Sequence, residues 1–116
     1  MNIWIIKIYE KNCLLLLDTY GVKLIIGDGV TKLGGYAFHY VRNLTTIIIP
    51  NSVTSIEWYA FKGCCSLTSV TFENTSGWFV STSSTATSGT NIDVTNPSTN
   101  ANYLKNTYNN YYWKKK

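Results

Sequence analysis

Few residues of this chain have the types and spacing that catalysis needs. A hydrolase requires a nucleophile beside a general base, or two carboxylates that face each other across a cleft. The sequence contains one histidine, His39, and no GxSxG, HExxH, phosphate-loop or dinucleotide-binding motif. The acidic residues are scattered: Glu10, Asp18, Asp28, Glu57, Glu73 and Asp93. We therefore expect no catalytic residues and no enzyme activity, and we expect His39 to lie at the surface.

Metal and disulfide chemistry is also poorly supported. Cys13, Cys64 and Cys65 are an odd set without CxxC spacing, and a single histidine offers zinc no second imidazole ligand. Asp28 lies between two glycines, but the further oxygen ligands that calcium requires are missing. We expect no metal and no cofactor. Cys64 is expected to be a buried apolar residue and Cys65 to be exposed.

The elements that carry these residues are organised by a repeat of 23 residues, which occurs at residues 24–46 and again at residues 47–69. Nine positions are identical: Ile25/Ile48, Ile26/Ile49, Val30/Val53, Thr31/Thr54, Tyr36/Tyr59, Ala37/Ala60, Phe38/Phe61, Leu44/Leu67 and Thr45/Thr68. Residues 70–72 begin a third copy. A period of this length is typical of a leucine-rich repeat solenoid.

Each repeat is predicted to form one coil of that solenoid. Long parallel strands are expected at residues 22–26, 44–49 and 67–72, short strands at 30–33 and 53–56, and helical turns at 34–40 and 57–63. Leu44, Ile47 and Ile49 should point inward, as should their equivalents 23 positions away. Phe38 should stack on Phe61 in the next coil.

Both ends of the chain depart from the repeat of residues 22–72. Residues 1–21 are expected to form strands at 3–9 and 14–18, as a degenerate first coil or cap. Residues 73–116 are expected to form a small β/α C-terminal cap. We predict that this cap contains a strand at 77–80, another at Ile92 and Val94, and a helix at 98–106 that begins after Asn96 and Pro97, with its periodicity extending roughly to Tyr112.

Two further segments of the C-terminal part are polar. Residues 81–90, STSSTATSGT, are interpreted as a linker or, alternatively, as a glycosylated segment. The three terminal lysines are interpreted as a solvated tail. They supply most of the net charge of +4, so we expect no nucleic-acid partner.

The second repeat resembles the repeat of the BspA-like leucine-rich repeat proteins. In that family an I-P-x-x-V-T-x-I opening is followed by A-F-x-x-C-x-x-L, and the matching residues here are Ile49, Pro50, Val53, Thr54, Ile56, Ala60, Phe61, Cys64 and Leu67. The first repeat departs from the pattern, because Gly27 replaces the proline and Val41 replaces the cysteine. The resemblance implies a right-handed solenoid with parallel strands on a microbial surface antigen, and a role in binding host or bacterial proteins.

The aromatic residues near the C-terminus allow two interpretations. Trp78, Tyr108, Tyr111 and Trp113 could form a surface that stacks on sugar rings or bases. Alternatively, they cover the apolar end of the last coil, which any solenoid must protect. We prefer the second interpretation.

The outward side chains of the long strands are the candidate binding surface. Strand alternation turns three rows of side chains outward: Val22/Thr45/Thr68, Lys23/Thr46/Ser69 and Ile25/Ile48/Thr71. The predicted binding residues are Lys23, Ile25, Thr46, Ile48, Ser69 and Thr71. The partner is expected to be a protein, such as a component of host extracellular matrix or of a cell surface.

A structural role is the main alternative to this adhesion or protein-binding function. In that case the chain is the C-terminal fragment of a longer repeat array, and its open N-terminal coil docks on more repeats or on another copy. We expect no membrane insertion, because charged residues interrupt the apolar residues 1–17, and no cleavable signal peptide is evident. The family resemblance nevertheless implies a cell-surface or secreted protein.

Overall fold

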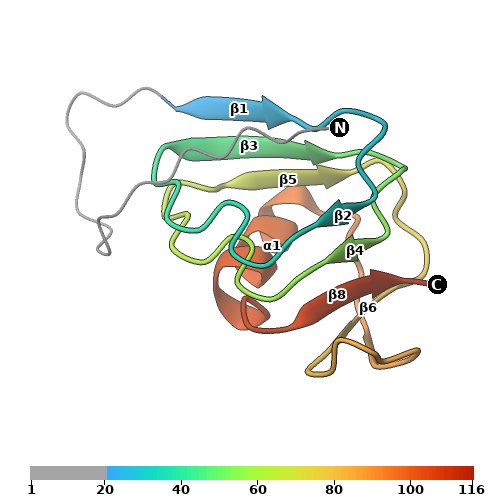
Figure 1. The fold of residues 1–116 in the computed structure, drawn as a ribbon. Helices are drawn as coiled ribbons and strands as arrows, with labels where there is room; N and C mark the ends of the chain where they lie inside the picture. Colours follow the sequence, from blue (N-terminus) through green and yellow to red (C-terminus); the bar gives the residue numbers. More distant parts are fainter. Residues whose placement is uncertain (1–20) are drawn as a thin grey trace.

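The computed structural model describes residues 21–116, which form two β-sheets and one helical segment (Figure 1). The first sheet is parallel, in the order β1 (Val22–Ile25), β3 (Leu44–Ile49) and β5 (Ser69–Phe72). The second is mixed, in the order β2 (Lys32–Leu33), β4 (Ser55–Ile56), β8 (Tyr112–Lys115), β6 (Trp78–Ser81) and β7 (Thr90–Asn91). Helix α1 (Pro97–Asn102) continues into the π-helical turn η1 (Tyr103–Thr107). The strands and cap predicted for the N-terminal segment lie outside the described residues.

The parallel sheet follows the sequence repeat in register. Leu24 pairs with Ile47, and Ile47 pairs with Val70, so that equivalent residues of successive repeats lie side by side. Ile49 pairs with Phe72 in the same way. The predicted parallel strands are confirmed, although β5 begins later than predicted. The short strands β2 and β4 are also parallel, and each covers the second half of its predicted range.

Threonine hydroxyls reinforce this register. Thr45 Oγ1 donates to the carbonyl oxygen of Val22 at 3.1 Å, and Thr68 Oγ1 donates to that of Thr45 at 3.3 Å. Thr54 Oγ1 donates likewise to the carbonyl oxygen of Thr31 at 3.5 Å. Each of these bonds spans 23 positions, so the hydroxyls connect equivalent points of neighbouring coils.

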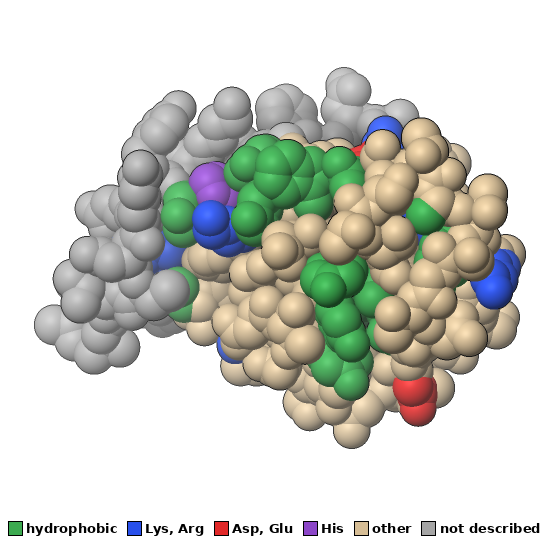
Figure 2. Space-filling model, turned by 90° about the horizontal axis from the view of Figure 1, so that it is seen from below, with side chains coloured by type: hydrophobic (Ala, Val, Ile, Leu, Met, Phe, Trp, Pro, Cys, Tyr) green, Lys and Arg blue, Asp and Glu red, His purple; other side chains and the backbone are tan. Residues whose placement is uncertain are grey.

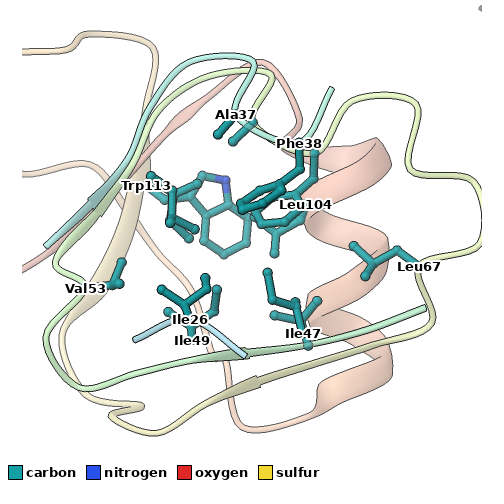
Figure 3. Close-up of a cluster of buried hydrophobic side chains, with 14 of the residues drawn as sticks. Ile26, Ala37, Phe38, Ile47, Ile49, Val53, Leu67, Leu104 and Trp113 are labelled. Carbon is teal, nitrogen blue, oxygen red and sulfur yellow. The ribbon is translucent and has the colours of Figure 1, made fainter. Parts of the chain in front are cut away.

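The core lies between the two sheets and the helical segment, as the cluster in Figure 3 shows. The predicted inward residues Leu44, Ile47 and Ile49 have exposed fractions of 2%, 0% and 1%. Phe38 and Phe61 stack with their ring centroids 5.2 Å apart and an interplanar angle of 20°. Both predictions are confirmed.

The helical turns predicted at residues 34–40 and 57–63 are wrong. These segments are runs of tight turns, and their residues in the left-handed region are Tyr36 (φ 61°), Tyr40 (φ 59°), Tyr59 (φ 59°) and Gly63 (φ 78°). A right-handed helix cannot pass through such residues, and the conformation costs roughly 1–2 kcal/mol for each one that is not glycine. Hydrogen bonds between coils compensate, such as the one from the N–H of Phe38 to the carbonyl oxygen of Ala60 at 2.8 Å.

The predicted helix at residues 98–106 corresponds to α1 and η1 together. Its start follows the predicted signal, because the side-chain oxygen of Asn96 accepts the N–H of Ser98 at 3.0 Å. Ala101 and Leu104 are buried, as predicted, with exposed fractions of 1% and 2%. This helical segment packs along β5, the last strand of the parallel sheet (Figure 1).

The prediction that helical periodicity extends roughly to Tyr112 is wrong beyond η1. The chain turns at residues 108–110 and then forms β8. This strand pairs antiparallel with both β4 and β6, and Trp113 lies opposite Ile56 on one side and Val80 on the other. The backbone of β8 therefore occupies the place beside β4 that a third repeat would fill with another short strand.

The interpretation of the terminal lysines as a solvated tail is wrong for Lys114 and Lys115, whereas Lys116 is exposed. Lys114 and Lys115 belong to β8 and are half-buried. The ammonium of Lys115 donates to the carbonyl oxygen of Ser76 at 2.6 Å, and that of Lys114 donates to the carbonyl oxygen of Ser84. The basic end of the chain thus holds the β6 region in place.

The segment at residues 81–90 connects two paired strands, β6 and β7, and is therefore a hairpin loop. Its own hydroxyls organise it, since Ser81 Oγ accepts the N–H of Ser83 at 3.1 Å. The strand predicted at Ile92 and Val94 instead lies at β7, and Val94 enters the core with 1% exposure.

The architecture is a stack of repeat coils that contribute the parallel sheet and the strands β2 and β4 of the mixed sheet, while the C-terminal part adds β8, β6, β7 and the helical segment. This agrees with the leucine-rich repeat class predicted from the sequence.

Candidate binding surface

The six predicted binding residues lie together on the parallel sheet. Lys23, Thr46 and Ser69 are paired across the three strands, and so are Ile25, Ile48 and Thr71 in the next outward row. Leu24, Ile47 and Val70, which lie between the two rows, are partly or fully buried in the core. The structure therefore places both rows on the sheet face opposite the core.

The third predicted row is irregular. A shift of register between Val22 and Lys23 pairs Val22 with Leu44, so Val22 does not lie opposite Thr45 as predicted. The hydroxyl of Thr45 nevertheless bonds to the backbone of Val22. The extra residue at this shift is Thr45 on β3, and the repeat pattern gives no sign of the bulge.

Exposure along the row Ile25/Ile48/Thr71 is uneven. Ile25 has an exposed fraction of 68%, and it is the most exposed large hydrophobic side chain among the described residues. Ile48 on the central strand is half-buried, and Thr71 is exposed but polar. The apolar part of the face is therefore concentrated at β1, where Lys23 supplies the one formal charge of the six predicted residues.

The alternative site at the C-terminal aromatics is not supported. Trp78 and Trp113 have exposed fractions of 2% and 1%, and their indole N–H groups donate to the carbonyl oxygens of Asn74 and Tyr108. Trp113 lies within the core cluster (Figure 3) and stacks on Phe72 with centroids 6.1 Å apart. These tryptophans are core residues, as the preferred interpretation held.

A second group of aromatic side chains was missed by the sequence reasoning. We call it the aromatic cluster: Tyr36, His39, Tyr40, Trp58 and Tyr59, which come from the two runs of turns. Figure 2 shows hydrophobic side chains gathered beside the histidine on the surface seen from below. The signal was the pair Tyr36/Tyr59, which the repeat preserves next to the buried Ala-Phe pair. It was overlooked because the segment was expected to be helical.

The repeat coils hold a buried neutral thiol and a partly exposed ion pair. Burial raises the pKa of the Cys64 thiol to about 12, and its Sγ donates to the carbonyl oxygen of Phe38 at 2.9 Å, so the thiol stays neutral. Cys65, expected to be exposed, is half-buried. Lys32 on β2 forms an ion pair at 2.7 Å with Glu57, which follows β4, and the hydrogen bond that the Lys32 ammonium donates to the Glu57 carboxylate raises the pKa of Lys32.

The described part of the chain offers neither a metal site nor a membrane-spanning helix. Residues 21–116 contain no group of three or more His, Cys, Asp or Glu side chains arranged to hold a metal ion. In the same range, no helix has the length and apolar character needed to cross a membrane.

Comparison with known proteins gives one match. A family profile described as the BspA type leucine rich repeat region, with six copies, matches residues 18–111. No curated protein and no solved structure matches the chain. The profile covers well over half of the sequence, and its repeat pattern agrees with the register of the parallel sheet. The chain therefore belongs to the BspA-type leucine-rich repeat family.

Proposed function

We propose that this chain is a protein-binding module of a microbial surface protein, and that the outward face of the parallel sheet contacts the partner. The observation that carries the proposal is the 68% exposure of Ile25, in one row with Ile48. Exposed apolar side chains that adjoin others on a repeat surface are a common feature of binding sites.

The remaining residues of the face indicate the kind of partner. Thr46, Ser69 and Thr71 provide short neutral hydrogen-bonding groups, and Lys23 adds one positive charge. Such a surface favours a protein over a nucleic acid, because no array of cations matches the spacing of phosphates. Family membership supports a location at the cell surface and a partner from host matrix or from another cell.

The test is a double substitution on this face. Ile25→Lys combined with Ile48→Lys should weaken binding to an immobilised extracellular-matrix extract about tenfold or more. The matched control is Thr87→Lys with Ser88→Lys, which adds the same charge to the exposed β6–β7 loop. Equal binding by a folded double variant and by the wild type would exclude this face.

A structural role is the second candidate, and one observation favours it. Leu24 is only half-buried, whereas Ile47 and Val70 in the same column have exposed fractions of 0%. A further coil of the same repeat, from an adjoining segment or a second copy, would complete this column. We propose on this basis that residues 22–72 belong to a right-handed solenoid and that residues 73–116 are its cap.

Sedimentation analysis separates the two candidates. Concentration-dependent association that Ile25→Lys abolishes would support docking through β1. A monomer at all concentrations that still binds matrix extract would support the binding module.

A further inference from the structure

We propose that the aromatic cluster binds a neutral carbohydrate, with sugar rings stacked on Tyr36 and Trp58. The cluster lies on the turns of the two coils, whereas the proposed protein-binding face lies on the long strands. The inference therefore goes beyond the proposed function and is independent of it.

The first argument is the exposure of the rings. Tyr36 and Trp58 have exposed fractions of 45% and 37%, whereas Trp78 and Trp113 are almost fully buried. Exposed aromatic side chains that touch one another leave a large apolar area in water unless a ligand covers it.

The second argument is the spacing of the rings. The ring of Tyr36 lies 5.5 Å from that of Trp58 and 5.6 Å from that of Tyr59, with interplanar angles of 60° and 37°. Tilted faces of this kind do not make one flat apolar surface. They suit a ligand that presents several small apolar faces in different directions, as the C–H faces of linked pyranose units do, and that carries hydroxyls at its edges.

The third argument is the conformation of the backbone. Tyr36 and Tyr59 both have φ near +60°, a region that glycine occupies freely, as Gly63 does one turn later. Aromatic side chains are present here despite that preference, and the hydrogen-bonded turns hold them in fixed directions. Strained residues of this kind are a recurring feature of ligand sites.

The fourth argument is the local charge. The ammonium of Lys62 lies 4.5 Å from the centre of the Tyr59 ring, so a cation already faces this ring and would repel a cationic ligand. Glu57, next to Trp58 in the sequence, is paired with Lys32. One lysine does not provide the row of cations that a polyanion requires. A neutral ligand is the class that remains.

The experiment is a titration of the full chain with neutral hexasaccharides of glucose, mannose and N-acetylglucosamine, followed by calorimetry and by tryptophan fluorescence. We expect saturable binding of at least one hexasaccharide. Trp58→Ala and Tyr36→Gly should each lower the affinity about tenfold or more. The Tyr36→Gly variant should fold, because glycine suits the backbone at this position, so it decides the question even if Trp58→Ala is unstable.

Two controls keep the outcomes distinct. Thr87→Lys with Ser88→Lys should bind the sugar as the wild type does, and so should the double variant Ile25→Lys with Ile48→Lys, which tests the protein-binding face. Absence of saturable binding, or wild-type affinity in a folded Tyr36→Gly variant, would overturn the proposal. Binding of a proline-rich peptide or of neutral lipid vesicles in place of the sugars, lost in the same variants, would also overturn it.

Discussion

The two edges of the parallel sheet are built from the same repeat but have opposite surroundings. At the β5 edge, Val70 is fully buried and the helical segment packs along the strand. At the β1 edge, Leu24 is half-buried and Ile25 is 68% exposed. The side chain of this column is thus more exposed at β1 than at β3 or β5, although other residues of the first repeat, such as Leu33 and Phe38, are buried.

The β5 edge shows how residues outside the repeat can replace such a neighbour. Asn100 is fully buried, and its amide donates to the carbonyl oxygens of Val70 and Val94, at 2.8 Å in each case. The ammonium of Lys105 donates to the carbonyl oxygen of Leu67, also at 2.8 Å. The bond to Val70 satisfies a carbonyl group of β5, where a further strand would otherwise supply an N–H group, and the other two bonds tie the helical segment to residues 94 and 67.

The largest loss of stability is expected for a substitution at the β5 end of the stack, where Trp113 stacks on Phe72. Trp113→Ala should lower the free energy of unfolding by about 3–5 kcal/mol, because Trp113 has 1% exposure and joins β8 to both β4 and β6. Urea denaturation measures it. Trp58→Ala, at 37% exposure, is the matched control and should cost clearly less. Similar losses of unfolding free energy for both variants would contradict the assignment of Trp113 to the core and Trp58 to the surface.

The core residues of the stacked coils, which lie between the two edges, provide a reference for these stability changes. Phe61→Ala should also cost about 3–5 kcal/mol, since Phe61 has 1% exposure and stacks on Phe38. Thr46→Ala, on the outward face of β3, should cost much less. Equal denaturation midpoints for these two variants would contradict the inward and outward assignment.

Removal of the side-chain hydrogen bonds of Asn100 at β5 is expected to have an intermediate effect on stability. Asn100→Ala removes the donor to two carbonyl groups, each of which then lacks that bond, and should cost roughly 2 kcal/mol or more. Asn102→Ala, an exposed residue of the same helix, is the control. Equal melting temperatures for the two variants would show that the side chain of Asn100 does not stabilise this edge of the sheet.

The buried thiol of Cys64 provides a test of the interior that depends on pH. Its pKa is raised from 9.0 to about 12, so above pH 9 the unfolded thiol ionises while the folded one stays protonated. The unfolded state then binds fewer protons, and the stability due to this group falls as the pH rises from 9 towards 12, by about 1 kcal/mol at pH 10.

Cys64→Val isolates this contribution, because valine occupies the equivalent position 41 of the first repeat. The difference in unfolding free energy between wild type and variant should shift in favour of the variant between pH 8 and pH 10. An unchanged difference would show that the thiol does not stay neutral in the core.

The smallest effect on stability is expected at the β1 edge of the parallel sheet. Ile25→Lys should change the stability of the monomer by no more than about 0.5 kcal/mol, as is usual for exposed positions. Thr71→Lys, in the same outward row at β5, is the control. A large loss for Ile25→Lys alone that depends on protein concentration would show that another molecule covers β1.

Much of the stacked part follows from the sequence alone. The 23-residue period sets which residues are neighbours across the sheet, and strand alternation sets which of them face inward, as Ile47 and Ile49 show. The start of α1 at Pro97, directly after its cap residue Asn96, is also local information. Of the candidate site, the two outward rows at Lys23 and Ile25 were predictable for the same reason.

Only the tertiary structure decided the rest. Trp113 lies in a strand because β4 and β6 offer unpaired edges on both sides, and no pattern within residues 108–113 encodes those partners. The bulge at Val22 and the left-handed Tyr36 depend likewise on contacts with the next coil. The repeat determines which residues of one coil contact the equivalent residues of the next coil. The end of the stack is determined by contacts between residues outside the repeat and residues within it.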